Sequence, residues 1–201
     1  MIPRMRNNLI VATALVIFGC STPSTVSPVA VPLQYKVQAK PAEFPTLPAC
    51  AAVSEVRVTD ARDNKNLGKR YVEGKSGASA AVTTTSDVAD WVRSGASDAL
   101  RRAGASVGKS GAPVLRLTVN QIDTSENVLH RSGYEGRIVV NAELVSRGNS
   151  CFKDHLDGFA ENYGYAGSVE NYQETLNHAL DRAMIRLMNS SDFKRAVCSC
   201  G

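Results

Sequence analysis

The distribution of proline divides this chain of 201 residues into parts with different capacity to fold. Six of its eight prolines lie between residues 21 and 48. Proline fixes its own φ angle and lacks a backbone N–H, so no helix spans a segment with this density of proline. Such segments favour extended, polyproline-like conformations. We therefore expect a semi-rigid tether over residues 20–49 and a single folded domain over residues 50–201.

The chain begins with a short basic segment that is followed by a run of apolar residues. Arg4 and Arg6 precede Leu9–Phe18, a run of uncharged and mostly apolar residues. A helix needs about 20 apolar residues to cross a bilayer, so this run is too short for a stable transmembrane anchor. A basic segment followed by a short apolar segment is typical of a secretory signal peptide. We predict a signal peptide over residues 1–19.

The residues at the end of this run, Ile17, Phe18, Gly19 and Cys20, resemble the lipobox of bacterial lipoproteins. The resemblance implies that Cys20 carries diacylglycerol and becomes the N-acylated first residue of the mature chain. Several acyl chains on one residue make an anchor effectively permanent. Ser21 follows, and lipoproteins without Asp at that place are normally passed on to the outer membrane instead of staying in the inner one. The alternative is a plain secretory signal with a chance cysteine.

The charge of the chain does not point to nucleic acid. The formal net charge is +4, but Arg4 and Arg6 are the only charged residues before Cys20, so removal of the signal peptide lowers it to +2. The remaining charges are scattered over the predicted helices and loops. We therefore expect no nucleic-acid partner, because such partners are bound by concentrated basic patches.

Hydrophobic periodicity predicts the order strand, helix, three strands, helix in the folded domain. Polarity alternates over residues 54–59, 115–120, 138–144 and 152–160, as half-buried strands require. Apolar residues recur at three and four over residues 88–103 and 169–187, with Ser86 and Ser168 opening the two helices. The Gly/Ser/Ala/Thr-rich stretch up to Thr85 predicts a long loop or irregular hairpin. We expect an α+β fold: a two-layer α/β sandwich with a four-stranded, mostly antiparallel sheet and two helices on one face (β-α-β-β-β-α).

Four cysteines remain once Cys20 is assigned to lipid: Cys50, Cys151, Cys198 and Cys200. The periplasm is oxidising, and four cysteines allow three pairings. In the predicted strand order all four lie at the same end of the sandwich. A ring between Cys198 and Cys200 would be very small and strained, so Cys50 and Cys151 are each expected to take one C-terminal cysteine; which one is left open. The alternative is a metal or redox site on the C-x-C motif, but no histidine neighbours it in sequence.

A charged turn follows the first predicted strand and contains Asp60, Arg62, Lys65, Leu67 and Gly68. In a short periplasmic lipoprotein this pattern resembles the YajG-like family of bacterial lipoproteins. The resemblance covers most of residues 52–195. It implies outer-membrane lipoprotein status and the sandwich fold, and it implies no reaction. The C-terminal cysteines and the proline-rich segment lie outside the pattern.

No motif in the sequence predicts catalysis or a bound metal. His130, His155 and His178 fall in a predicted loop, strand and helix, without ligand spacing. His155 lies between Asp154 and Asp157, but successive strand residues point to opposite faces of a sheet. We predict no catalytic residue, no metal site and no cofactor other than the covalent lipid.

Charged and aromatic residues near loop and helix ends are the candidates for a partner-binding surface. They are Asp60, Arg62, Lys65, Trp91, Tyr163, Tyr165 and Tyr172. Charged loops present partner surfaces, and tyrosines are favoured at interfaces. The alternatives are an Asp–Arg pair that fixes the loop and tyrosines that pack in the core.

These features predict a lipid-anchored protein on the periplasmic side of the outer membrane. We expect it to be a non-enzymatic accessory protein that binds an unidentified envelope protein. One alternative is a component of a multi-protein envelope transport or assembly machine. The rival class is an envelope enzyme.

Overall fold

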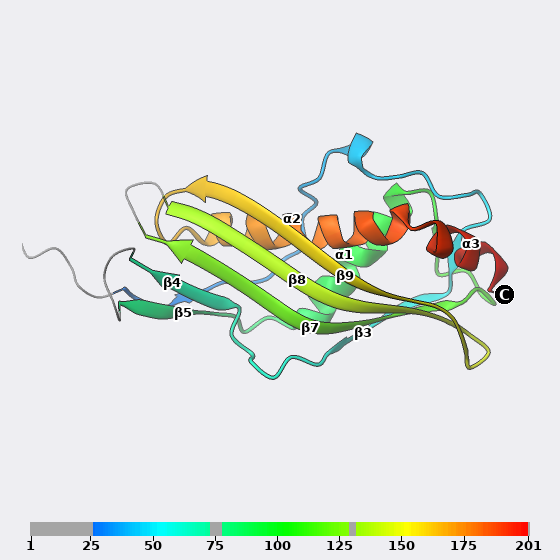
Figure 1. Ribbon diagram of the computed structural model, residues 1–201, viewed down its shortest axis with the longest axis horizontal. Helices are drawn as coiled ribbons and strands as arrows, with labels where there is room; N and C mark the ends of the chain where they lie inside the picture. Colours follow the sequence, from blue (N-terminus) through cyan, green and yellow to red (C-terminus); the bar gives the residue numbers. More distant parts are fainter. Residues whose placement is uncertain (1–25, 73–77, 129–131, 201) are drawn as a thin grey trace, which may run out of the picture.

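Three long strands that follow one another in the chain form the centre of the fold (Figure 1). The structure is a computed structural model that describes residues 26–72, 78–128 and 132–200. The three long strands are β7 (Val114–Asn127), β8 (Ser132–Ser146) and β9 (Asn149–Gly164), each antiparallel to the next. Between β8 and β9 the chain turns at Arg147 and Gly148, whose φ angles of 50° and 84° suit a two-residue hairpin.

The sheet has seven strands in the described part of the chain, where the sequence predicted four. β3 (Glu55–Asp60) pairs in parallel with the first part of β7, and β4 (Gly68–Tyr71) pairs in parallel with its last part. β5 (Ser79–Thr83) and β1 (Val29–Ala30) continue the sheet in the order β1-β5-β4-β7-β8-β9. A separate parallel pair joins β2 (Ala52–Val53) to β6 (Ser106–Val107). The α+β class is confirmed, whereas the number of four strands is wrong, because β1, β4 and β5 extend the sheet. The large sheet is mixed, and its longest ladders, β7–β8 and β8–β9, are antiparallel.

β4 and β5 lie in the stretch that the sequence predicted as a long loop or irregular hairpin, and their antiparallel pairing agrees with the hairpin. β4 and β5 are only four and five residues long, and β5 consists mainly of small side chains, so neither shows a clear alternation of polarity. Their pairing with each other and with β7, together with the fully buried Leu67 and Val82, holds them in the sheet. Strand formation here follows from tertiary packing more than from local propensity.

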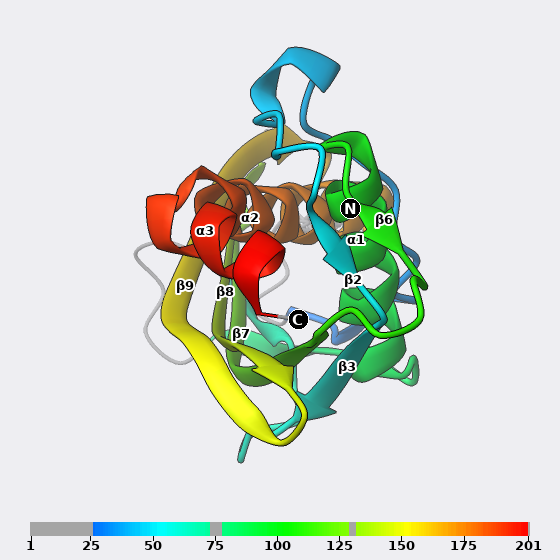
Figure 2. The ribbon, with the colours of Figure 1, turned by 90° about the vertical axis from the view of Figure 1, so that its right-hand side faces the viewer.

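Two long helices cover one face of the sheet (Figures 1 and 2). They are α1 (Val88–Arg102) and α2 (Val169–Asn189), and a third helix, α3 (Ser191–Ser199), follows in the described chain. Ser168 caps α2 by accepting the N–H of Asn171. Asp87, not Ser86, caps α1. The sequence did not predict α3, which is separated from α2 by Ser190 alone.

Glycines on the inner face of the sheet let α2 lie directly on the strands. A Cβ atom at Gly158 of β9 would stand 2.0 Å from the carbonyl oxygen of Ala179 in α2. A Cβ at Gly136 of β8 would stand 2.9 Å from the Cγ2 of Thr175. Glycine is therefore required at Gly158 for close backbone approach, and at Gly136 a larger residue would have to displace the Thr175 side chain.

Two disulfides join the chain at the end of the sheet shown in Figure 2. Cys50 pairs with Cys198 and Cys151 pairs with Cys200. Each of the two earlier cysteines thus takes one C-terminal partner, and the structure selects one of the two pairings that the sequence left open. The cross-links fasten α3 to the start of β2 and to the start of β9.

The proline-rich segment does not behave as a free tether in its described part, residues 26–49. It lacks helix apart from the 3-10 turn η1 (Pro41–Glu43), as its prolines require. It nevertheless runs along the domain and buries apolar side chains in the core, namely Val31, Leu33, Ala39, Phe44 and Leu47. The described part of the predicted tether is thus packed against the domain, because burial of this apolar surface favours docking.

Polar residues of α2, spaced one helical turn apart, hold this segment in place. The contacts are Gln173 Nε2 to the carbonyl of Pro32, Asn177 Nδ2 to the carbonyl of Gln34 at 3.1 Å, and Asp181 Oδ2 to the N–H groups of Gln38 and Ala39 at 2.7 and 2.8 Å. A helix places residues four apart on one face, so the three side chains form a row. The row satisfies backbone groups of a segment that, over these residues, has no strand partner.

Candidate functional site

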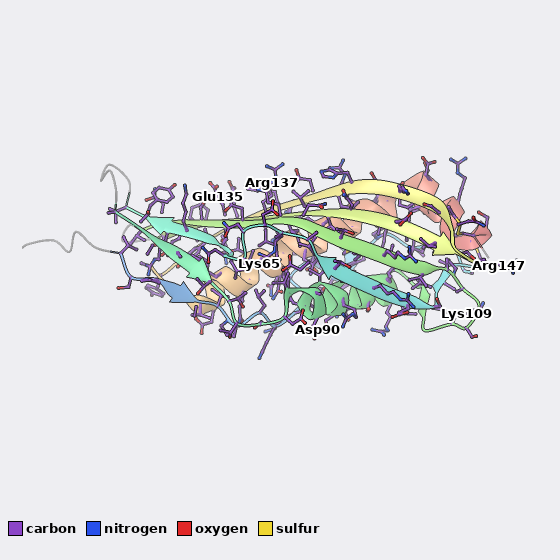
Figure 3. All side chains as sticks on the ribbon, turned by 90° about the horizontal axis from the view of Figure 1, so that it is seen from below. Lys65, Asp90, Lys109, Glu135, Arg137 and Arg147 are labelled. Atoms are coloured by element: carbon purple, nitrogen blue, oxygen red, sulfur yellow. A yellow bond between two sulfur atoms is a disulfide. The ribbon has the colours of Figure 1, made fainter. Side chains whose placement is uncertain are left out.

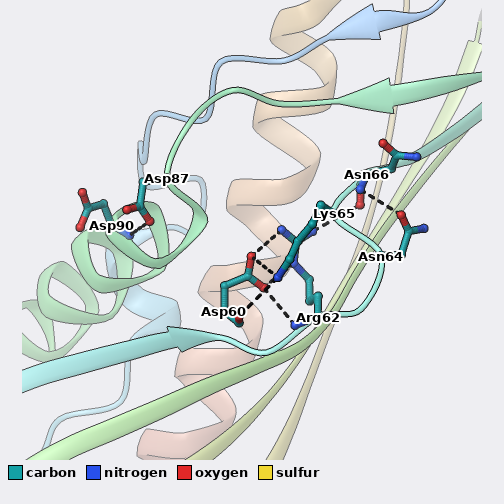
Figure 4. A network of polar contacts seen from close by, with 7 residues as sticks. All are labelled: Asp60, Arg62, Asn64, Lys65, Asn66, Asp87 and Asp90. Atoms are coloured by element: carbon teal, nitrogen blue, oxygen red, sulfur yellow. Dashed lines mark hydrogen bonds and ion pairs between the residues drawn. The ribbon is translucent and has the colours of Figure 1, made fainter.

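The charged turn after β3 is folded back on itself (Figure 4). Arg62 is buried, and its guanidinium donates hydrogen bonds to both carboxylate oxygens of Asp60, at 2.8 and 2.9 Å. Lys65 adds an ion pair to Asp60 at 3.4 Å. The hydrogen bonds from Arg62 are the main reason that the pKa of Asp60 is lowered to about 2. This geometry fixes the path from β3 to β4. Of the three residues of this turn predicted for a partner surface, Asp60, Arg62 and Lys65, only Lys65 is well exposed.

Two other candidates for a partner surface lie in the core. Trp91 is 3% exposed and donates its indole N–H to Asn177 Oδ1 at 2.8 Å. Tyr172 is fully buried and donates its hydroxyl to Glu126 Oε2 at 2.5 Å. Neither side chain reaches the surface, so both have a packing role. The sequence already indicated that both side chains are buried, because each lies on the apolar stripe of its predicted helix.

A buried charge that the sequence analysis missed lies beneath the start of α2. Glu126 of β7 is fully buried and pairs with Arg70 of β4, whose Nε lies 2.9 Å from Oε2. The N–H of Gly167 donates to Oε1 at 2.7 Å, and Tyr134 donates to the same oxygen at 3.2 Å. Burial, with the nearby carboxylate, raises the pKa of the Tyr172 hydroxyl. The cluster fixes the turn that leads into α2, since a buried carboxylate needs several donors.

The face of the sheet opposite the helices is lined by rows of polar side chains (Figure 3). One row crosses four strands in register and consists of Arg57, Arg116, Glu143 and Lys153. Arg57 and Arg116 stand directly opposite each other, which is unfavourable for like charges. Glu143 lies 4.0 Å from Arg116 and 3.3 Å from Lys153. The row therefore carries a local surplus of positive charge.

A second row of uncharged polar groups adjoins the first. Thr59, Thr118, Asn141 and His155 follow one another across β3, β7, β8 and β9. His155 Nδ1 lies 2.9 Å from Asn141 Oδ1. Together the rows line a shallow hollow of about 730 Å³. Such an open polar surface is suited to hydrogen-bonding and charge contacts with a ligand or protein.

Exposed aromatic side chains gather at the end of β9 and in the turn after it. Phe159 is 47% exposed, Tyr163 is 74% exposed and Tyr165 is 86% exposed. The two tyrosines were predicted as surface candidates, whereas Phe159 was missed. The alternation along β9 is the signal that identifies Phe159, because it shares a face with His155 and Asp157. Tyr163 also lies over Gly133, where a Cβ would stand 3.6 Å from its ring.

The predicted lipidation site, Cys20, lies outside the described residues, as does the predicted signal peptide over residues 1–19. Lipidation of Cys20 therefore stays a prediction. Among the helices of the described chain, none has both the length and the apolar character needed to cross a membrane.

Comparison with known proteins identifies the fold and leaves the family open. No family model matches the sequence, and no curated protein matches it. A solved structure from Xanthomonas campestris, of the DUF330 family, is 12% identical with a TM-score of 0.53, over 86% of this chain and 100% of that one. A minor lipoprotein from Acinetobacter baumannii is 13% identical with a TM-score of 0.35, over 68% of this chain and 92% of that one. The first similarity shows a shared fold only, and the second is too distant to carry an argument.

Proposed function

We propose that this chain is a lipid-anchored, YajG-like lipoprotein on the periplasmic face of the outer membrane. In this proposal it is a non-enzymatic accessory protein that binds another envelope protein, and its only attached group is the lipid on Cys20. The observation that carries the proposal is the group of exposed aromatic side chains Phe159, Tyr163 and Tyr165. Aromatic residues are enriched at protein interfaces, because a large ring buries much apolar area at a low cost in side-chain entropy.

Tyr163 and Tyr165 lie at the end of the domain where the described chain begins, and Phe159 lies further back along β9. The carbonyl of Ser27 accepts a hydrogen bond from Arg70, and Arg70 pairs with Glu126, which accepts the N–H of Gly167 in the turn after β9. Cys20 is seven residues before Ser27. Seven extended residues reach at most about 25 Å. A lipid on Cys20 would thus keep this end near the membrane, and the partner would be bound close to the membrane surface.

Affinity capture from crosslinked envelopes tests the binding function. We expect one partner in fixed ratio with the wild-type chain, and at least about tenfold less of it with a Tyr163→Ala, Tyr165→Ala variant, because interface aromatics carry much of the binding energy. Lys109→Ala, at the opposite end of the molecule (Figure 3), is the matched control and should capture as much as wild type. Absence of any stoichiometric partner would contradict the proposal.

Membrane fractionation tests the anchor separately. A Cys20→Ser chain should be recovered in the soluble periplasmic fraction, whereas the wild-type chain should remain with the outer membrane. A variant that stays on the membrane would show that the lipobox interpretation is wrong.

The alternatives give different results in the same experiments. A component of a transport or assembly machine would be captured with several proteins in constant proportions. For the rival class, an envelope enzyme, the decisive result would be a reaction catalysed by the purified chain and abolished by a substitution that leaves the fold intact.

A further inference from the structure

β9 is the last strand of the large sheet, and it pairs with β8 on one side only. It is 16 residues long. A long edge strand presents unpaired N–H and C=O groups, and proteins usually block them with bulges, charges or covering segments. The backbone groups of β9 that point away from β8 and have no hydrogen-bond partner therefore mark where another strand can be added.

Two side chains block the edge of β9 at separate points. Asp154 Oδ1 accepts the N–H of His155 at 2.8 Å, and Asn162 Oδ1 accepts the N–H of Tyr163 at 2.8 Å. These N–H groups thus have side-chain partners in place of a neighbouring strand. Backbone groups point alternately to the two sides of a strand, so every second residue from His155 to Tyr163 points its N–H away from β8.

Three backbone positions between the two blocked points are open. They belong to Asp157, Phe159 and Glu161, which we call the open stretch. Within the described chain their N–H groups have no hydrogen-bond partner. An added strand can bond to both the N–H and the C=O of each of these residues, as in strand addition to other exposed sheet edges.

The open stretch has room for side chains on both sides. A hollow of about 710 Å³ on the side of α2 is lined by Phe159, Arg182 and Arg186, among others. A second hollow, of about 520 Å³, lies on the outer face of the sheet, and its lining includes Asp123, Glu135, Arg137, Asp157, Phe159 and Arg186. Side chains of an added strand alternate between its two faces, so they would enter the two hollows in turn.

The two hollows differ in charge. Arg182 and Arg186 are exposed on successive turns of α2 and line the helix-side hollow together with Glu43 and Asp157. Because Asp157 is paired with Arg137, the two arginines outnumber the one remaining carboxylate of this hollow. On the outer face, Arg137 is already paired with Asp157, and Asp123 and Glu135 add two carboxylates, so a further carboxylate is unfavourable there and the ring of Phe159 offers an apolar contact. The helix side therefore favours carboxylates, and the outer side favours an apolar side chain.

We propose that the open stretch of β9 binds a short extended segment of a partner protein by strand addition. The segment alternates acidic side chains, which face Arg182 and Arg186, with apolar side chains, which cover Phe159. This inference rests on the proposed partner-binding function and names the chemistry of the partner.

A second copy of this chain fits the edge less well. Two-fold pairing of two β9 strands about Phe159 would set Asp157 of each copy opposite Glu161 of the other. Like charges directly opposite are unfavourable in antiparallel pairs. The blocked N–H groups of His155 and Tyr163 also restrict pairing to a short segment, whereas a second β9 would present its full length.

Binding of a short synthetic peptide in which glutamate and valine alternate tests the proposal on the mature chain. Titration followed by amide NMR and hydrogen exchange should show slowed exchange at Asp157, Phe159 and Glu161. A peptide with lysine in place of glutamate should bind at least about tenfold more weakly. Failure of the glutamate peptide to bind, or protection at other amides alone, overturns the proposal.

Proline substitutions provide the matched comparison, because proline removes one N–H and is tolerated on a free edge. Glu161→Pro removes an open N–H and should weaken peptide binding by about tenfold, whereas Glu161→Ala should not. His155→Pro removes an N–H that is already blocked and should leave binding unchanged. Equal loss in both proline variants, with unchanged thermal unfolding, overturns the proposal.

Crosslinking in cells separates this inference from the proposed function. A photoreactive amino acid at Glu161 should capture the envelope partner, while one at Lys109 should not. Capture that occurs only from other surfaces leaves the partner-binding function standing and overturns strand addition. Absence of any partner overturns the proposed function itself.

Discussion

The hydroxyl of Tyr35 donates a 2.6 Å hydrogen bond to Asp181 Oδ1, 146 positions further along the chain. Asp181 is 1% exposed, and its other oxygen accepts two backbone N–H groups of the same N-terminal segment. Burial, together with this carboxylate, raises the pKa of Tyr35. One side chain of α2 thereby fixes three groups of the proline-rich segment.

Asp181→Ala should release this segment from α2. Loss of a buried acceptor that serves three donors is expected to cost about 2–4 kcal/mol of unfolding free energy. Urea unfolding measures the loss, and limited proteolysis within residues 31–47 should become faster. Asp192→Ala, which removes an exposed carboxylate of α3, should change the unfolding free energy by less than about 0.5 kcal/mol. Equal effects of the two changes would contradict the assignment.

Asp60 predicts a specific response to acid. Its pKa is lowered from 3.8 to about 2 in the fold, so its contribution to stability is present above pH 4 and is lost as the pH falls to 2. Protonation of Asp60 should therefore account for roughly 1 kcal/mol, after solvent screening, of the unfolding free energy that is lost in acid. The Asp60→Asn variant should not show this pH-dependent loss of unfolding free energy, because it has no carboxylate at this position. The difference in unfolding free energy between the two proteins should shrink from pH 4 to pH 2, and a constant difference would contradict the prediction.

Gly158→Ala tests the close approach of α2 to β9. Because the new Cβ would overlap the carbonyl of Ala179, we expect a loss of about 2–4 kcal/mol in thermal or urea unfolding. Gly133→Ala on β8 is the control. Its Cβ would meet only the ring of Tyr163 at an ordinary contact distance, so stability should change by less than about 0.5 kcal/mol.

The two disulfides should each contribute to stability. They join residues 148 and 49 positions apart, and closing loops of this length restricts the unfolded chain by about 4–5 kcal/mol in the chain-entropy model. Replacing Cys50 and Cys198 by serine, or Cys151 and Cys200, should lower the unfolding free energy by about 2–5 kcal/mol. Alkylation without reductant should leave all four cysteines unmodified in the wild-type chain. Two or more modified cysteines would show that the pairing is wrong.

Several elements could be predicted from local pattern. Alternation at Leu115, Leu117 and Val119, and the stripe through Leu176 and Leu180, is a property of a few neighbouring residues, and the observed strands and helices contain them. The strand order also placed the four cysteines at one end. For β4 and β5 the pattern left a long loop and an irregular hairpin open, and the short strands form because β7 offers a backbone to pair with.

The residues predicted for a partner surface were also predicted only in part. Tyr163 and Tyr165 are exposed, while Trp91, Tyr172 and Arg62 are buried, and residue type alone does not distinguish the two groups. The alternation along β9 places Phe159 on the same face as His155 and Asp157, whereas the exposure of its ring, 47%, is known only from the structure, in which β9 is the edge strand.

The sequence by itself determined the α+β class, the positions of the two long helices and the central strands, and the predicted lipid address at Cys20, because each depends on residues close together in the chain. Only the tertiary structure decided that the proline-rich segment packs on α2, that Glu126 is buried with Arg70, and that β9 has an open stretch between two blocked points. These features depend on contacts between residues far apart in sequence, where burial and backbone pairing outweigh local preference.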